Sequence, residues 1–235
     1  MYTKIKLLAF FLLFCLFQAN AQSLEYKKYK WEAEPKLHEI STVDKDGNYT
    51  VLLDKTIVEF AYNSENQLEM FETKHTIIRL NNDKGIEAMN KVYISTASAV
   101  EEIDLKARTI TSAGKIINLN KSAIKKVDNY EDAGPFTIFA MEGIDVGSEI
   151  EYIYTNKRNF RLNNSVFLQT DKIKKNVSID IYSPENLVYI AKGYNGFPEF
   201  TVDTIIKKKN HIYASIDRIE ALNDEKYSAT KANKM

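Results

Sequence analysis

Apolar and polar residues alternate with a period of two over most of this chain. From Glu102 to Thr109 the apolar side chains keep to odd positions and the charged ones to even positions, as in a strand with one buried face. The turn at 112–115 makes 116–117 a hairpin return. Further segments that read as strands are 51–62, 70–80, 92–96, 136–140, 148–155, 166–173, 176–182, 187–191, 201–207 and 211–216.

Helical signals are few by comparison. Asp83 could cap a short helix through Met89, and Ser122 could begin a turn through Val127. Repeated short strands with Gly, Asn and Asp turns favour two antiparallel sheets packed face to face, or one extended sandwich. We therefore expect an all-β fold in a single domain over residues 22–235, with a short C-terminal tail from about residue 221.

The N-terminus is typical of a secretory signal. Lys4 and Lys6 precede the apolar run 7–17, which is too short to cross a bilayer, and the small residues of Ala19-Asn20-Ala21 follow it. We expect residues 1–21 to be a signal peptide cut after Ala21, which predicts a periplasmic or extracellular protein with no membrane contact after cleavage. The alternative is an uncleaved N-terminal anchor.

The chain's only cysteine, Cys15, lies inside that segment. A lipoprotein signal would need a small residue before the thiol, and Phe14 stands there. Cleavage would leave a chain without a thiol, and cysteine catalysis requires a thiolate. We therefore expect no cysteine nucleophile and a fold held together by burial alone.

Charge is balanced, with 32 Lys plus Arg against 32 Asp plus Glu. A nucleic-acid or membrane-surface protein would show a basic excess, so the sequence predicts neither partner.

Catalytic and metal-binding patterns are weak. The nearest match to a serine elbow, Gly147-Ser148-Glu149, lacks the preceding partner glycine. His38, His75 and His211 have no metal-ligand spacing. We expect no catalytic residue, no cofactor and no metal site, and hence no enzyme.

Asp44 to Asn48 invites a calcium interpretation. A calcium loop starting at Asp44 would need glycine at its sixth place and a carboxylate at its twelfth, where the chain has Tyr49 and Lys55. A turn before the following strand is the better interpretation.

Glu149 and Glu151 share one face of an expected strand and could pass for paired acid and base. Their alternation with Ile150, Tyr152 and Tyr154 indicates that they line the solvent face, where carboxylates keep ordinary pKa values.

Four aromatic residues surround Gly193 and Gly196 and form a candidate ligand-stacking platform for a sugar or peptide: Tyr189, Tyr194, Phe197 and Phe200. The alternative is core and loop packing, which accounts for such aromatics more often.

Several stretches resemble a known family in order and spacing. They are VLLD at 51–54, HTIIRLNNDKGIE at 75–87, ARTI at 107–110 with AGK at 113–115, and EGIDVGSEIEY at 142–152. The family is the uncharacterised domain that precedes a transglutaminase-like domain in exported bacterial proteins. The resemblance covers about residues 36 to 228.

The resemblance implies an extended, distorted antiparallel β-sandwich, with one or two short helices. It places any transglutaminase or peptidase chemistry in the following domain, on Cys, His and Asp residues that no position here matches. The tail 220–227 is similar to the family's exit from the sandwich, whereas Glu142 departs from the proline of many relatives.

Two hypotheses follow. The first is a non-catalytic exported module, truncated or free-standing, whose partner is a transglutaminase-like catalytic domain, a glycan or a cell-envelope peptide. The second is one half of a cysteine transglutaminase or peptidase, completed by a separately encoded catalytic chain. A downstream reading frame with a Cys, His and Asp triad would favour the second.

Overall fold

The computed structural model describes residues 23–45, 47–161, 165–204, 206 and 208–222. The expected signal peptide, Cys15 and the tail beyond residue 222 lie outside the described residues. No helix within the described part is long and apolar enough to cross a membrane.

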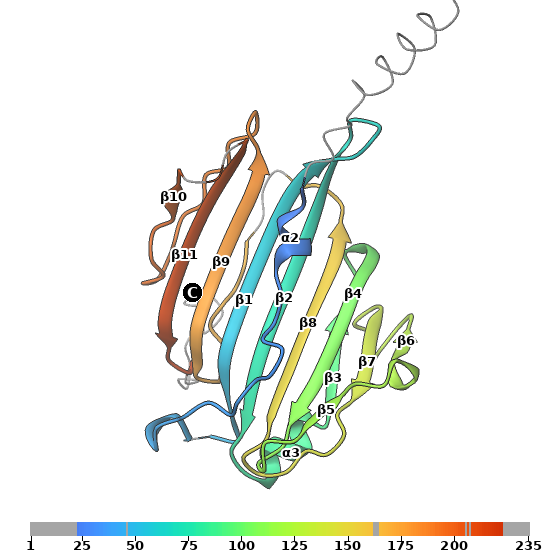
Figure 1. The fold of residues 1–235 in the computed structure, drawn as a ribbon, viewed down its shortest axis with the longest axis vertical. Coiled ribbons are helices and arrows are strands. Elements are labelled where there is room, and N and C mark those ends of the chain that lie inside the picture. Colours follow the sequence, from blue (N-terminus) through green and yellow to red (C-terminus); the bar gives the residue numbers. More distant parts are fainter. Residues whose placement is uncertain (1–22, 46, 162–164, 205, 207, 223–235) are drawn as a thin grey trace, which may run out of the picture.

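Two sheets make up the fold (Figure 1). The large sheet has the strand order β10-β11-β9-β1-β2-β8-β4-β5, and only the β1 and β9 pair is parallel. Its strands are β1 (Tyr49–Tyr62), β2 (Leu68–Leu80), β4 (Ala99–Ile110), β5 (Ile116–Asn118), β8 (Glu149–Arg158), β9 (Lys174–Pro184), β10 (Thr201–Asp203) and β11 (Lys209–Ile219). The small sheet has the order β3-β7-β6, with β3 (Lys91–Ser95), β6 (Lys125–Val127) and β7 (Phe136–Ala140).

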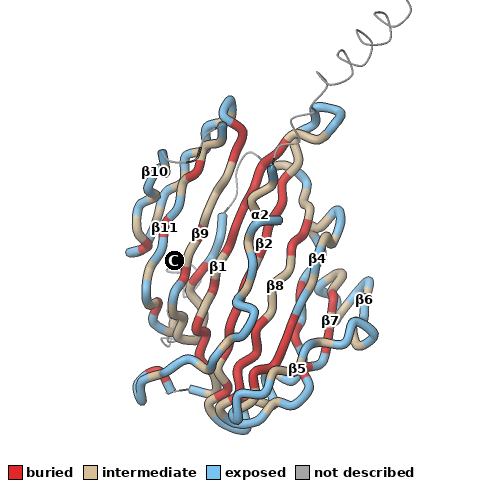
Figure 2. The backbone as a smooth tube through the Cα atoms, in the orientation of Figure 1, coloured by how far each residue is buried: buried red, intermediate tan, exposed pale blue. Residues whose placement is uncertain are grey.

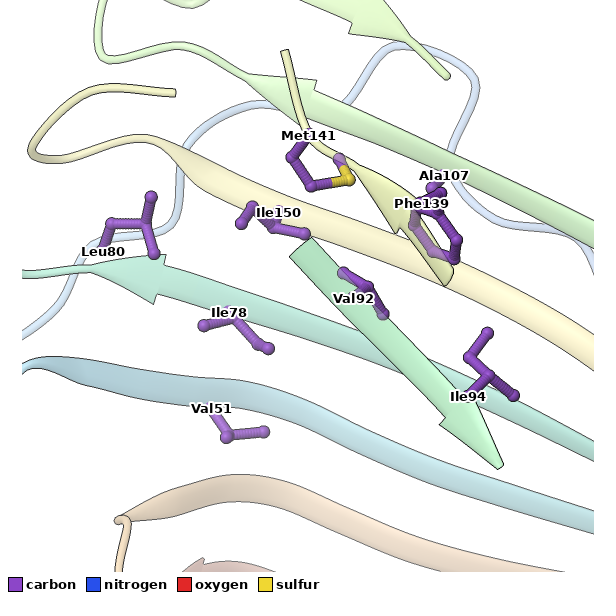
Figure 3. Packing of buried hydrophobic residues seen from close by; sticks show 9 residues of the cluster. All are labelled: Val51, Ile78, Leu80, Val92, Ile94, Ala107, Phe139, Met141 and Ile150. Carbon is purple, nitrogen blue, oxygen red and sulfur yellow. The ribbon is translucent and has the colours of Figure 1, made fainter. Parts of the chain in front are cut away.

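The small sheet packs on one face of the large sheet. Ile78, Leu80 and Ile150 of the large sheet meet Val92 and Phe139 of the small one in a single buried cluster (Figure 3). Successive side chains of a strand point to opposite faces, so the even-numbered residues of β2 and β8 define this inner face. Figure 2 shows buried residues concentrated along β1, β2 and β8, whereas β10 and β6 are mostly exposed.

The opposite face is crossed by the N-terminal segment, residues 23–40, which we call the strap (Figure 1). It contains α2 (Glu25–Lys28) and is otherwise irregular, and the 3-10 turn Val43–Lys45 links it to β1. The Tyr26 ring stacks on Phe71 with 4.9 Å between centroids. Because Phe71 is an odd-numbered residue of β2, the strap forms a third layer, opposite the small sheet.

The expected all-β sandwich is therefore confirmed, with local differences. Segments 166–173 and 187–191 were expected as strands but are irregular, and 125–127 is a strand that the sequence did not predict. Leu168 is buried in a core cluster and Tyr189 packs against another. The apolar alternation there reflects side chains packed on a sheet rather than a hydrogen-bonded strand.

The short helix predicted at 83–89 is present as α3 (Asp83–Met89), but its cap is Asn82, whose side chain accepts a hydrogen bond from the Gly85 amide at 3.1 Å. The turn expected from Ser122 to Val127 is shorter, a 3-10 turn at Lys121–Ala123 capped by Asn120.

Candidate functional site

Glu149 and Glu151 are buried, contrary to the prediction that they line a solvent face. Their residues are 1% and 2% exposed. The alternation correctly placed them opposite Ile150, but the strap covers that face.

Glu151 is the centre of a buried polar cluster. Its Oε1 lies 2.8 Å from Nε2 of His75, and its Oε2 accepts a hydrogen bond of 2.5 Å from Nε of Arg108. The Tyr29 hydroxyl of the strap lies 2.7 Å from Nδ1 of His75. Burial raises the pKa of Glu151, but the hydrogen bonds from His75 and Arg108 outweigh this effect and lower its pKa below the ordinary value.

Arg108 is held between the sheet and the strap. It is 3% exposed, and its guanidinium carbon lies 4.1 Å from the centroid of the Trp31 ring. Its Nη2 donates to the backbone carbonyl of Glu32 at 2.7 Å. A buried guanidinium stacked on an indole is a favourable cation–π contact, so Arg108 fixes the position of this part of the strap.

Glu149 anchors the strap at a second point. Its carboxylate accepts hydrogen bonds from the backbone amide of His38 at 2.9 Å and from Nη2 of Arg79 at 2.6 Å, and its Oε2 lies 2.8 Å from Nδ1 of His38. Burial raises the pKa of Glu149, but these hydrogen bonds outweigh burial and lower it. The hydrogen bond to Glu149 in turn raises the pKa of His38.

The cluster around Glu151 continues across the sheet as a row of acidic and basic side chains. His211 lies 2.9 Å from Asp180 and 3.0 Å from Asp203, Asp180 pairs with Lys55, and Lys55 lies beneath the Tyr29 ring. The row takes one residue from each of β10, β11, β9, β1, β2, β8 and β4, in the order Asp203, His211, Asp180, Lys55, His75, Glu151 and Arg108. We call these seven residues the charge row.

The order Tyr29, His75, Glu151 matches that of a nucleophile, a base and an orienting acid. Burial, with smaller contributions from Glu151 and Asp180, raises the pKa of Tyr29 to about 12. The hydroxyl therefore stays protonated near neutral pH, and both ring nitrogens of His75 are already occupied. The arrangement is suited to holding the strap on the sheet.

Asp44, where the calcium loop was considered, is 3% exposed and binds cations of the protein itself. Its Oδ2 accepts a hydrogen bond of 2.9 Å from Lys175, and Oδ1 pairs with Arg218. The Lys175 hydrogen bond holds the pKa of Asp44 well below its usual range. Across the described residues, no three His, Cys, Asp or Glu side chains gather so as to hold a metal ion.

The four aromatic residues proposed for ligand stacking do not form one platform. Tyr189 stacks on Phe60 at 4.3 Å, and Phe197, 8% exposed, packs in a different cluster together with Phe200. Tyr194 is 65% exposed and faces Lys192 at 5.5 Å. Ligand binding at these residues stays a prediction, and of the four side chains only Tyr194 is mostly exposed.

A groove beside the strap was not predicted from the sequence. It has a volume of about 470 Å³ and lies between the strap and strands β4 and β8, with Tyr26, Tyr29 and Trp31 among its lining residues. The signal that could have indicated it is YKKYKW at 26–31, where aromatic residues alternate with lysines. We call this hollow the strap groove.

Comparison with solved structures finds similarity to a protein from Parabacteroides distasonis described as a "putative protease". The TM-score is 0.58 at 14% sequence identity, and the match covers 77% of this chain but 37% of that one. This chain therefore spans little more than a third of that protein's length. At this identity the likeness shows the fold alone. No curated protein matches the sequence significantly.

Comparison with family profiles finds a match to a domain of unknown function with a solved structure, DUF3857, over residues 66–215. The matched range holds β2, β8 and β4, and with them His75, Glu151 and Arg108 of the charge row. Since it covers more than half of the 235-residue chain, the protein belongs to the DUF3857 domain family.

Proposed function

We propose that this chain is an exported, non-catalytic β-sandwich module that serves as the N-terminal accessory or binding domain of a transglutaminase-like protein, in truncated or free-standing form. The proposal rests on one observation, which is that the buried titratable side chains form hydrogen bonds within the protein. His75, Glu151 and Glu149 are engaged with one another, with Arg108 or Arg79, or with the strap. These hydrogen bonds support a role in holding the strap over this face of the sheet.

The resemblance noted in the sequence supports the accessory role, since members of the resembled family precede a transglutaminase-like domain. The structural match to part of a longer protein is in keeping with a domain that accompanies another. The proposed partner is that catalytic domain, a glycan or a cell-envelope peptide.

The experiment is an activity assay on the purified exported protein. We expect neither amine transfer nor peptide hydrolysis, and no effect of iodoacetamide, because cleavage after Ala21 removes Cys15. The mass of the exported product reports the cleavage directly, and Ala21→Arg, which removes the small residue at the cut, serves as the unprocessed control. Iodoacetamide-sensitive activity in a clean preparation would refute the proposal.

A second candidate function is the non-catalytic half of a split cysteine transglutaminase or peptidase. It is favoured by the description of the longer similar protein as a "putative protease", of which the match covers 37%. Mixing this protein with a chain encoded just downstream that carries Cys, His and Asp would test it. Activity that appears only in the mixture would establish the second candidate over the first.

A further inference from the structure

The strap groove has the size and the composition of a ligand site. Its volume of about 470 Å³ falls within the range of small-molecule pockets, about 300–1,000 Å³. Three rings of the strap line it, Tyr26, Tyr29 and Trp31, together with Ile103, Ile153 and Thr155 of the sheet. The rings are half-buried, so the groove offers apolar surface that remains open to solvent.

A second hollow continues the groove. It has a volume of about 220 Å³ and is lined by Asn118 and Leu119 as well as by Trp31 and Lys106, which also line the strap groove. The two hollows therefore meet at Trp31. Two adjoining hollows on either side of one indole suit a chain molecule with repeated units better than a single compact ligand.

The charge along both hollows is positive. Lys27, Lys30, Lys106 and Lys121 line them, against the single carboxylate of Asp104. Lys106 and Asp104 pair at 2.9 Å. Within the described ranges Lys27, Lys30 and Lys121 have no carboxylate partner, so these cations are available to an anionic ligand.

The floor of the groove is formed by two strands that are paired with each other. β4 and β8 are paired with each other there, with Lys106 opposite Ile153 and Asp104 opposite Thr155. Their facing backbone groups are hydrogen-bonded to each other, so an extended peptide cannot insert between these two strands, whereas the other edge of β4 pairs with β5 only at residues 108–110. Recognition at the floor must use side chains, namely ring faces, lysines and the hydroxyl of Thr155.

From this geometry we propose that the strap groove binds an acidic polysaccharide, a chain of sugar rings that bear carboxylates. The apolar faces of the sugar rings pack on Trp31 and the tyrosines, and the carboxylates pair with the lysines. The inference deepens the proposed function and rests on it, because it names the class of ligand that a binding module of this kind holds.

The test uses the one tryptophan of the chain, Trp31, whose emission reports on both hollows. The probe is an oligogalacturonate of six residues, and a neutral cello-oligosaccharide of equal length is the control. We expect the acidic probe to shift or quench the emission and to give a calorimetric binding signal that weakens as salt is raised. The neutral probe should do neither.

The matched variants separate the groove lysines from the overall charge. Lys30→Gln with Lys106→Gln removes two cations of the groove, and Lys84→Gln with Lys91→Gln removes two exposed cations on α3 and β3. We expect about tenfold weaker binding of the acidic probe in the first double variant and less than about twofold in the second. Circular dichroism of all variants checks that the fold is kept.

Three outcomes would overturn the inference: no response to the acidic probe, equal binding of the neutral probe, or equal loss in the two double variants. An acidic peptide that displaces the oligogalacturonate and binds more tightly would also overturn it, in favour of a peptide ligand. The proposed function can be tested separately from saccharide binding. If the saccharide test fails, binding of a transglutaminase-like partner, measured in a pull-down without any saccharide, would still support the accessory role.

Discussion

Replacing Glu151 by glutamine keeps the shape of the side chain and removes its charge. Among substitutions that keep the shape of a side chain, we expect this one to be among the most destabilising. Glu151 is 2% exposed and takes part in two charge-assisted hydrogen bonds, with His75 and from Arg108. Each such bond contributes about 1.5–3 kcal/mol. Glutamine keeps one acceptor but turns an NH₂ toward the other partner, and it leaves Arg108, 3% exposed, without its counter-charge. We expect a loss of about 3–5 kcal/mol in the free energy of unfolding.

The measurement is urea unfolding followed by circular dichroism and by Trp31 emission in the same samples. Glu87→Gln, at an exposed position of α3, is the matched control and should change the unfolding free energy by less than about 0.5 kcal/mol. In a chain of this size the Glu151 variant should also melt roughly 6–20 °C lower, at about 2–4 °C per kcal/mol. A loss below about 1 kcal/mol would refute the view that the Glu151 cluster holds the strap and the sheet together.

Three further predictions concern other parts of the fold. The pair of His38 with Glu149 adds stability below the ordinary pKa of His38 and loses it as pH rises through the raised pKa. The stability difference between wild type and His38→Gln, below about 1 kcal/mol because the imidazole is partly exposed, should therefore shrink as pH rises above about 6.5 in urea titrations. Phe197→Ala should cost about 3–5 kcal/mol and Tyr194→Ala less than about 0.5 kcal/mol, because only Phe197 is buried, and equal losses on thermal unfolding would contradict this placement. Gly85→Ala should cost more than about 1 kcal/mol in the same assay, since a Cβ there would lie 2.1 Å from a backbone oxygen, and unchanged stability would count against that close approach.

The strands could be predicted because their signal is local. In β8, Ile150 alternates with Glu149 and Glu151, and a period of two is enough to assign both the strand and its two faces. The helix α3 could be predicted because a polar capping residue is also a local signal, although the side chain that caps it is that of Asn82. Pairing of β1 with β9 in parallel joins residues more than a hundred positions apart, and no local pattern encodes it.

The candidate site could not be predicted because it depends on the strap, whose sequence has no periodic pattern of apolar and polar residues. The alternation in β8 separates the two faces but does not say what covers each one. The strap is irregular and half-exposed, and its link to Glu151 through Tyr29 and His75 joins positions 29, 75 and 151. The sequence did contain a sign of it in the aromatic residues of YKKYKW, which begin at Tyr26, shortly after the expected cleavage site at Ala21.

The polar character of the strapped face has a physical consequence for the groove. An irregular segment lying on an apolar face would be stabilised in several registers, because burial of apolar surface has no direction. Tyr29 can meet His75, and His38 can meet Glu149, in one register only, and a slip would break both contacts as well as the hydrogen bond from Arg108 to the Glu32 carbonyl. The position of Trp31 over Arg108, and with it the wall shared by the two hollows, is thus set by buried charges. Because the strap must be in place for that wall to exist, an acidic ligand bound there should also raise the stability of the strap against urea, in proportion to RT ln(1 + [L]/Kd).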